Sequence, residues 1–428
     1  MALHKTRPLA DIRVIRVIYG KIASAISNQS SAINNQSSVI NFATLAPWRE
    51  KYHAITIYEK ELSQMRKEMY NQSLNIFIAI KRRSIHVMTK QQTNIIKGVA
   101  ILMMIFLHLF NRMGADYHGL CQPLLYIGER PLVNIIANAC HPVAFFLILS
   151  GYGLSYVWVN KGNNLRQQGL RILKLYITYW IVMAIFAGMG CFINPAQYPG
   201  DIWSIIGNIT AVKTTWNYET WFLFPYVLLS MTSMWLFRMM DRLGNKVSFI
   251  VAFFLSFSSA FIISRCSAKE IDINPVINVV LVYCDLLLNF ILGALLYRYA
   301  ARKKIQRLRI WQASALLVII VGLEMLSPTQ ADDSFYAFFV ILLILQFPYQ
   351  NRLGGAFLAT LGRHSMPMWM CHTFLSIYLF PNFIYGFRYP VLIFVVLTAL
   401  SYAISIVVLK SSTVLENLLK LHNNHNHK

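Results

Sequence analysis

The chain has 428 residues, of which 56% are hydrophobic and 13% charged, and its mean hydropathy is +0.48. So apolar a composition excludes an ordinary soluble domain and indicates a protein that crosses a membrane several times. Lys and Arg outnumber Asp and Glu by 39 to 17, which gives a formal net charge of +22. Because these charges lie between apolar runs and not along one basic face, we expect no nucleic-acid partner.

Residues 1–87 differ in composition from the rest of the chain. They contain two consecutive polar repeats, residues 28–34 (NQSSAIN) and residues 35–41 (NQSSVIN). Such low-complexity sequence has little apolar surface to bury, so we expect a poorly ordered extension. At Met88 a segment typical of the start of a membrane enzyme begins, and we hypothesise that the functional chain starts there. The alternative for part of the extension is an interfacial amphipathic helix over residues 11–26.

The remaining chain contains about ten apolar runs long enough to span a membrane. A helix rises about 1.5 Å per residue, so about 20 residues cross a hydrocarbon layer roughly 30 Å thick. Lipid offers no hydrogen-bond partner to bare peptide groups, so helices are the expected spanning element. The runs are centred on residues 95–110, 139–159, 170–191, 221–237, 249–263, 276–297, 310–326, 335–347, 367–385 and 391–409. The sequence therefore predicts an all-α polytopic bundle over residues 88–410, followed by a polar tail, residues 411–428.

Basic residues alternate between the predicted loops. If the first helix runs outward, most Lys and Arg fall on the inner segments, as the positive-inside rule requires. Both termini are then cytoplasmic, and the helix number is even. The outer segments carry only Arg112, Arg130, Lys213, Arg265, Lys269 and Arg388.

Six cysteines are present, without a CxxC or Cys/His spacing of the kind that binds zinc. We therefore expect no metal site. Four of the cysteines, Cys121, Cys140, Cys191 and Cys266, lie toward the predicted outer side, where disulfides are permitted, but their pairing cannot be deduced.

Ionisable side chains inside a bilayer are costly and often functional, and the apolar runs contain five: Lys97, His108, Asp285, Glu324 and His372. Lys97 and His108 are eleven residues apart, which is three helical turns plus about 20° and roughly 16 Å along the axis. They therefore share one helix face. The alternative for a single intramembrane His is a hydrogen-bonded core residue.

Five segments resemble the acyltransferase 3 family of integral membrane acyltransferases. Residues 97–108 (KGVAILMMIFLH) are similar to its first-helix signature, a basic residue and then a His after ten others. The basic residue is more typically Arg, so Lys97 keeps the charge but loses the planar guanidinium. Later segments match in family order. They are residues 145–156 (FFLILSGYGLSY), 171–180 (RILKLYITYW), 220–231 (TWFLFPYVLLSM) and 361–375 (LGRHSMPMWMCHTFL).

The resemblance implies transfer of an acyl group, usually acetyl from acetyl-CoA, to a sugar hydroxyl of a cell-surface polysaccharide or lipid-linked glycan. It also implies a multi-pass protein of the bacterial cytoplasmic membrane. An imidazole is well suited to take the proton of the attacking hydroxyl, so His108 is the candidate base, with direct transfer through the imidazole as the alternative. Lys97 is expected to orient the donor or to stabilise developing negative charge, or else to reach the membrane interface by snorkelling.

Donor and acceptor contacts are expected at opposite ends of the bundle. CoA is polyanionic and cytosolic, so Arg166, Arg171 and Lys174 at the inner face are the candidates for its phosphates, with anionic-lipid contact as the alternative. The basic cluster over residues 298–309 is a weaker second candidate.

The acceptor candidates lie toward the predicted outer side. Glu219 and Trp221, beside Asn217, combine an aromatic ring with polar groups and suit a sugar, although an interfacial aromatic belt explains Trp221 equally well. His372 is included among the substrate-binding candidates, or it is a structural partner hydrogen-bonded across the bundle.

Asp285 and Glu324 keep a second function open. Intramembrane carboxylates carry protons or bind cations in transporters, so a proton-coupled transporter of a small solute or glycan precursor is the alternative to the enzyme. The hydropathy pattern shows no internal repeat, which favours the enzyme. Besides membrane lipid and the glycan acceptor, a separate periplasmic transferase is an open alternative as a partner.

Overall fold

The computed structural model describes residues 88–111, 119–162, 164–302, 308–327, 333–348 and 353–419, with residues 64, 68, 84–85, 305–306 and 421. The repeats and the alternative helix over residues 11–26 lie outside the described residues. Of the predicted tail, residues 411–428, the described part ends at residue 419, apart from residue 421. By its contacts the chain divides into two units, Met1–Lys81 and Arg82–Lys428. The helices and strands of the fold belong to the second unit.

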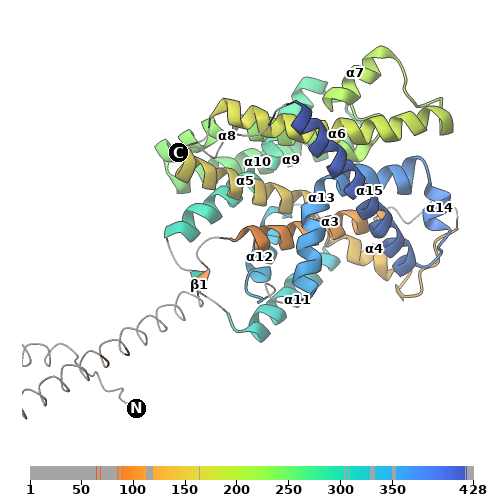
Figure 1. The fold of residues 1–428 in the computed structure, drawn as a ribbon. Helices are drawn as coiled ribbons and strands as arrows, with labels where there is room; N and C mark the ends of the chain where they lie inside the picture. Colours follow the sequence, from red (N-terminus) through yellow and green to blue (C-terminus); the bar gives the residue numbers. More distant parts are fainter. Residues whose placement is uncertain are drawn as a thin grey trace, which may run out of the picture. The chain divides into compact units, whose positions relative to one another are not determined.

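The second unit is a helical bundle (Figure 1). Its helices are α3 (Lys90–Phe110), α4 (Leu132–Ala137), α5 (Pro142–Lys161), α6 (Leu165–Ile193), α7 (Ile202–Thr210), α8 (Leu223–Leu243), α9 (Asn245–Ala268), α10 (Pro275–Arg302), α11 (Ile310–Leu326), α12 (Asp333–Ile344), α13 (Leu353–Thr373), α14 (Pro381–Tyr385) and α15 (Pro390–Leu418). A 3-10 turn, η2 (Tyr218–Thr220), precedes α8, and a π-helical turn, η4 (Phe374–Tyr378), follows α13.

Strands are short in the part of the chain that the structure describes. β1 (Ser84–Ile85) pairs antiparallel with β4 (Ile305–Gln306), with Ser84 opposite Gln306. The second pair is antiparallel too: β2 (Tyr126–Ile127) pairs with β3 (Arg130–Pro131). The predicted all-α class is confirmed.

Each predicted apolar run overlaps a helix. Among the described residues, seven helical stretches are long and apolar enough to cross a membrane: α3, α4 with α5, α6, η2 with α8, α9, α10 and α15. The helices α11 and α12 are apolar but shorter. The run over residues 367–385 falls on the end of α13, η4 and α14. The count of ten crossings and the cytoplasmic position of both termini stay predictions.

Several helices begin at side chains that satisfy their first backbone N–H groups. Before α3, the Thr89 hydroxyl accepts from the Gln92 N–H at 3.1 Å, and the Gln92 side chain accepts from the Thr89 N–H at 2.9 Å. This reciprocal capping box fixes the start of the helix that carries His108. Asn164 caps α6 in a similar way, by accepting from the Gln167 N–H at 2.7 Å.

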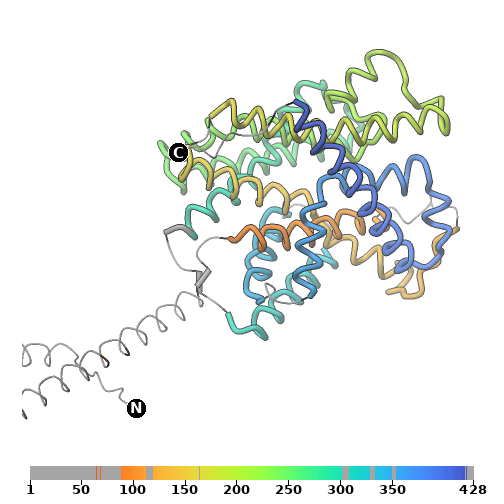
Figure 2. The backbone as a smooth tube through the Cα atoms, in the orientation of Figure 1, coloured from red at the N-terminus to blue at the C-terminus, as the bar shows by residue number. Residues whose placement is uncertain are grey.

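Two helix pairs cross closely because glycines lie at their contacts. In the first pair, α3 and α13, a Cβ on Gly98 would lie 2.0 Å from Leu358 O, and one on Gly362 would lie 1.8 Å from Asn94 O. Figure 2 shows these two helices, orange and blue, crossing in the bundle. The second pair, α5 and α10, is equally tight at Gly151 and Gly293. Packing is thus the role of Gly151, since small residues let membrane helices approach.

The short helix α7 folds back along α6. Its last three carbonyls accept hydrogen bonds from three α6 side chains on one face: Tyr179 to Asn208 O at 2.6 Å, Tyr176 to Thr210 O at 2.8 Å and Trp180 Nε1 to Ile209 O at 2.9 Å. These donors lie near the middle of α6, an apolar helix long enough to span a membrane, and lipid offers no partner to the carbonyls of a helix end. The aromatic donors therefore let α7 end there, and the chain continues from α7 to η2 and the site described next.

Candidate active site

His108 of α3 and His372 of α13 meet inside the bundle. Their rings approach with Nδ1 of His108 2.8 Å from Nε2 of His372, and the ring planes are 18° apart. His372 is fully buried, whereas His108 is partly exposed. Both residues were predicted from the sequence, and the hydrogen bond across the bundle agrees with the structural alternative given for His372.

The hydrogen-bond network assigns the ring protons of the neutral pair. Nδ1 of His372 lies 2.8 Å from Trp369 O and 3.2 Å from Met368 O, and carbonyl oxygens only accept, so this nitrogen carries the proton. Nε2 of His372 is then an acceptor, and Nδ1–H of His108 donates to it. The basic lone pair of His108 consequently lies on its Nε2.

The end of α3 that carries His108 is held by neighbouring side chains. Asn134 Nδ2 donates to Phe110 O at 3.0 Å and to Asn111 O at 3.2 Å, and the Tyr385 hydroxyl donates to Leu109 O at 3.1 Å. These bonds occupy carbonyls that a helix C-terminus otherwise leaves without partners. They fix the backbone from which the imidazole projects.

Lys97 lies on the same continuous helix, and its place next to Gly98 puts it at the crossing with α13. It is partly exposed, and within the described residues it forms no hydrogen bond or ion pair. The helix separates it from His108 by roughly 16 Å along the axis. An ammonium at that distance does not touch atoms that react at His108, so a role toward a distant part of an extended donor fits better than charge stabilisation at the imidazole.

The segment from Asn217 to Trp221 packs beside the helix that carries His372. Asn217 bonds on both sides of that residue: its Nδ2 donates to Met370 O at 3.2 Å, and its Oδ1 accepts from the Thr373 hydroxyl at 2.9 Å. The Glu219 carboxylate accepts from the Tyr378 hydroxyl at 2.6 Å. Glu219 is therefore buried against η4, whereas Trp221 is 37% exposed.

The positions of His372 and Glu219 differ from those expected of residues that contact the substrate directly. Both side chains are buried and bonded to protein partners, His372 to His108 and Glu219 to Tyr378, so each supports a neighbouring residue of the site. Of the three acceptor-binding candidates, Trp221 alone presents an exposed ring. Tyr378 and Thr373 were missed, because an isolated hydroxyl residue in an apolar run carries no sequence signal.

The three basic donor candidates on α6 have different surroundings. Lys174 Nζ forms an ion pair with Glu416 Oε2 of α15 at 2.7 Å. Arg171 is exposed and donates to Gln168 Oε1 at 3.2 Å, and Arg166 is exposed. The side chain of Gln168 in turn bonds to the Ser230 hydroxyl of α8. Arg166 and Arg171 are therefore better placed than Lys174 to bind an anion.

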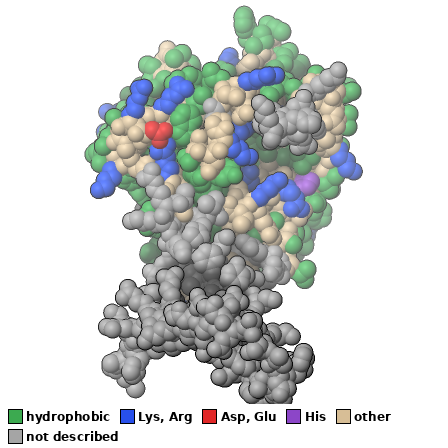
Figure 3. All heavy atoms as spheres, turned by 60° about the vertical axis from the view of Figure 1, so that its left-hand side comes forward, with side chains coloured by type: hydrophobic (Ala, Val, Ile, Leu, Met, Phe, Trp, Pro, Cys, Tyr) green, Lys and Arg blue, Asp and Glu red, His purple; other side chains and the backbone are tan. Residues whose placement is uncertain are grey.

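Basic side chains gather where α5 and α8 end. Figure 3 shows this face, with many more Lys and Arg than acidic side chains. The exposed basic residues at the adjoining helix ends include Lys161, Arg166, Arg171, Arg242 and Lys246. In the weaker candidate cluster, Arg298 is buried and paired with Asp241 at 2.9 Å. Its charge is therefore used inside the protein and is a poorer candidate for binding a donor phosphate.

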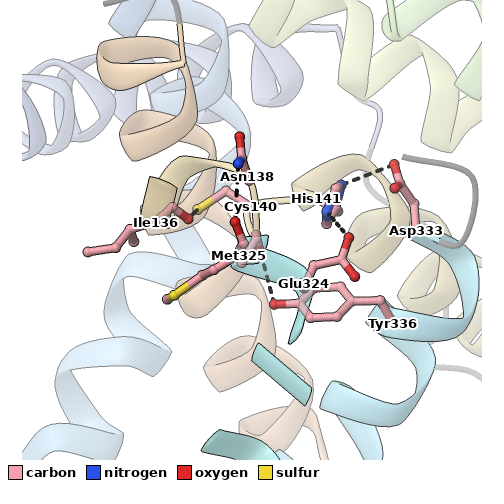
Figure 4. A network of polar contacts seen from close by, with 9 residues as sticks. Ile136, Asn138, Cys140, His141, Glu324, Met325, Asp333 and Tyr336 are labelled. Atoms are coloured by element: carbon pink, nitrogen blue, oxygen red, sulfur yellow. Dashed lines mark hydrogen bonds and ion pairs between the residues drawn. The ribbon is translucent and has the colours of Figure 1, made fainter. Parts of the chain in front are cut away.

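Glu324 and Asp285, the two acids without a sequence partner, both lie near a third carboxylate. His141 Nε2 is 2.8 Å from Glu324 Oε1, and His141 Nδ1 is 3.1 Å from Asp333 Oδ2 (Figure 4). Asp285 interacts electrostatically with Asp333. Sequence reasoning missed His141 and Asp333, because the four residues come from four separate segments.

A cavity of about 350 Å³ lies between α4 and the end of α11, apart from the imidazole pair. Arg130, Ile135, Asn138, Met325, Leu326 and Ser327 line it. Neither His108 nor His372 is among these residues, so the pair is recognised by its chemistry and not by this cavity.

The fold is that of a multi-pass membrane protein in which two imidazoles pair inside the helical bundle. Over residues 91–410 the sequence matches the acyltransferase domain of the acyltransferase 3 family. The chain belongs to this family, as its motifs predicted, and it is a membrane acyltransferase. Comparisons with curated proteins and with solved structures gave no match.

Proposed function

We propose that the protein transfers an acyl group, acetyl in the first instance, from acyl-CoA to a hydroxyl of a surface polysaccharide or lipid-linked glycan, in the bacterial cytoplasmic membrane. The observation that carries the proposal is the bond between His108 Nδ1 and His372 Nε2. It leaves the basic lone pair of His108 on Nε2, and acyl transfer to a hydroxyl requires such a base.

In the proposed reaction, His108 Nε2 accepts one proton and later returns it. The acceptor O–H transfers its proton to His108 Nε2 as its oxygen attacks the thioester carbonyl carbon. The tetrahedral intermediate then expels CoA by breaking the C–S bond, and the imidazolium returns the proton to the thiolate. The products are an ester and free CoA thiol, and His108 is restored.

His372 acts as a positioning residue. Its Nε2 accepts from His108 Nδ1–H, while its own Nδ1–H is held by the carbonyls of Trp369 and Met368. This chain keeps His108 in one tautomer and one orientation, as the third member of a nucleophile–base–orienter arrangement does. It also stabilises the imidazolium that forms during the reaction.

The donor is expected to bind with its phosphates at the basic face. Arg171 is exposed there and donates a hydrogen bond to Gln168. Gln168 in turn bonds to Ser230 of α8, so this chain of bonds connects α6 with α8. Arg166 adds a second exposed guanidinium, whereas Lys174 is neutralised by Glu416. Lys97 lies between the helix start and His108 and suits a contact with the middle of the donor.

The acceptor is expected to stack on Trp221. Its exposed ring lies two residues after the buried Glu219, which is anchored to Tyr378, so η4, the turn that follows α13, holds the platform. Aromatic rings bind the apolar faces of sugars, and neighbouring polar groups fix their orientation.

The test compares wild type, His108→Ala and His364→Ala in membranes supplied with labelled acetyl-CoA. His364 lies on α13 as His372 does, but it bonds to Ser405 at 2.9 Å and serves as the matched control. We expect His108→Ala to lower acyl incorporation into glycan by about 10²–10⁴-fold and His364→Ala to leave it nearly unchanged. Incorporation that persists without His108 would overturn the assignment. Proton-dependent solute uptake that survives the substitution would favour the transporter instead.

A further inference from the structure

A polar cluster outside the active site joins three helices at their ends. His141 directly precedes α5, Glu324 lies in the last turn of α11, and Asp333 begins α12. The side chains of His141 and Glu324 are 4% and 7% exposed. One ligand atom from each of the three residues lies within 4.8 Å of the other two. Figure 4 shows the imidazole between the two carboxylates.

The contact between His141 and Glu324 lacks the geometry of a hydrogen bond. Nε2 lies 2.8 Å from Oε1, yet among the described residues this nitrogen has no hydrogen-bond partner and is buried. Asp333 Oδ1 is also buried, and it has no hydrogen-bond partner in the part of the chain that the structure describes. Two ligand atoms on one tetrahedral zinc ion lie roughly 3.3–3.6 Å apart, because each bond is about 2.0–2.2 Å long. Nε2 and Oε1, which lie 2.8 Å apart without a hydrogen bond between them, therefore need only a small shift to bind a common cation.

The charge of the cluster also favours a cation. Two carboxylates, Glu324 and Asp333, face one imidazole, and Asp285 interacts electrostatically with Asp333. Even a protonated His141 contributes one positive charge against the two carboxylates that face it. Buried carboxylates are usually paired or bound to a metal, since an isolated buried charge is costly.

We propose that His141, Glu324 and Asp333 bind a divalent metal ion, with Zn²⁺ as the best match, and that this ion ties α5 to α11 and α12. Imidazole nitrogen and carboxylate oxygen are both zinc ligands, and three protein ligands leave a position for water. This site departs from the sequence-based expectation of no metal, which rested on motif spacing. It is independent of the proposed acyl transfer.

The neighbouring backbone is arranged to hold the ligands in place. The Tyr336 hydroxyl donates to Ala139 O at 2.8 Å, and Asn138 Nδ2 donates to Met325 O at 3.2 Å. The first bond links α12 to the segment before His141, and the second links that segment to the end of α11. The three ligands are thus supported by protein contacts that do not depend on the ion.

The test uses full-length protein in detergent, stripped with a chelator and titrated with Zn²⁺ alone. We expect wild type to bind one equivalent and its melting temperature to rise when zinc is restored. Glu324→Gln and Asp333→Asn keep the shape of each side chain but remove its charge, so each should weaken zinc binding by at least about 10-fold. The control is Asp272→Asn, an exposed acid between α9 and α10, which should bind as wild type does.

Two results would overturn the proposal. Wild type that takes up no zinc equivalent beyond that of the two ligand variants would show a metal-free ion-pair cluster. An equal loss in Asp272→Asn would show binding to surface carboxylates. If a ligand variant fails to fold, removal and restoration of zinc on wild type decides: an unchanged melting temperature contradicts the tie between the helices.

Discussion

Gly98 and Gly362 face each other across the contact of α3 and α13: a Cβ on Gly362 would lie 3.0 Å from the backbone nitrogen of Gly98. Ten residues further along each helix stand His108 and His372. The two helices therefore keep the same register from the glycine contact to the imidazole pair. The spacing of the active-site nitrogens depends on how closely these backbones approach.

Substitution of Gly362 by Ala should separate the helices. The added methyl would lie 1.8 Å from Asn94 O, a backbone atom that cannot rotate away. We expect a lower melting temperature and a loss of acyl transfer larger than the loss of folded protein, because the imidazoles move apart. The measurement is specific activity per folded molecule, alongside thermal unfolding.

Gly354→Ala on the same helix is the control. No heavy atom lies within 4 Å of the position that its Cβ would take, and alanine is the better helix former by about 1 kcal/mol. It should leave activity unchanged. Equal behaviour of the two alanine variants would show that the close crossing does not position the site.

The helix face of His108 was predictable, whereas its partner was not. Lys97 and His108 are eleven residues apart, a spacing that places them on one face of a helix, and both lie in the continuous helix α3. The partner His372 is 264 residues away, and no local pattern specifies which face of α13 meets α3. The glycines that set this contact are visible in the sequence, but only the fold shows which helix each one touches.

Removal of His372 should reduce turnover more than donor binding. His372→Ala deletes the acceptor of His108 Nδ1–H, so we expect kcat to fall by at least about 10-fold, part of the roughly 10²–10⁴-fold that a positioned base contributes. The KM for acetyl-CoA should change little. Steady-state kinetics in membranes measure both.

The variant His372→Gln separates positioning from packing. Its side-chain oxygen can still accept from His108, so its kcat should lie between those of wild type and His372→Ala. If the glutamine variant is no better than alanine while both fold, the hydrogen bond is not what His372 supplies. A normal kcat in His372→Ala would contradict the positioning role altogether.

Loss of one aromatic hydrogen-bond donor should destabilise the packing of α7 against α6. Tyr179→Phe keeps the ring but leaves Asn208 O without the hydroxyl that donates to it at 2.6 Å. Asn208 O keeps its bond from the Ala211 N–H at 3.1 Å, so the substitution removes one net hydrogen bond, and the free energy of unfolding should fall by about 0.5–1.5 kcal/mol. Chemical denaturation in detergent measures it.

Tyr156→Phe is the matched control for this effect. Tyr156 is 38% exposed on α5, and among the described contacts its hydroxyl forms no hydrogen bond. Its removal should cost far less. A similar loss in both variants would mean that ring packing, and not the hydroxyl, matters at residue 179.

Side chains such as Tyr176, Tyr179 and Trp180 show another limit of sequence reasoning. In an apolar run they resemble an interfacial aromatic belt, yet their polar atoms hold the end of α7 at mid-helix depth. The same applies to Glu324, whose partner His141 lies in a distant segment. Local composition predicts that such residues are buried, but not which polar group each one satisfies.

The difference between Arg171 and Lys174 leads to a prediction about the donor. Lys174 is neutralised by Glu416 at 2.7 Å, whereas Arg171 keeps an exposed guanidinium. If CoA phosphates bind here, Arg171→Gln should raise the KM for acetyl-CoA by about 10-fold, the effect of one charge-assisted hydrogen bond, with kcat nearly constant. Lys174→Gln should raise it less. Arg242→Gln, an exposed arginine at the end of α8, controls for the general positive field, and an equal rise in all three variants would show that this field, and not a contact at Arg171, attracts the donor.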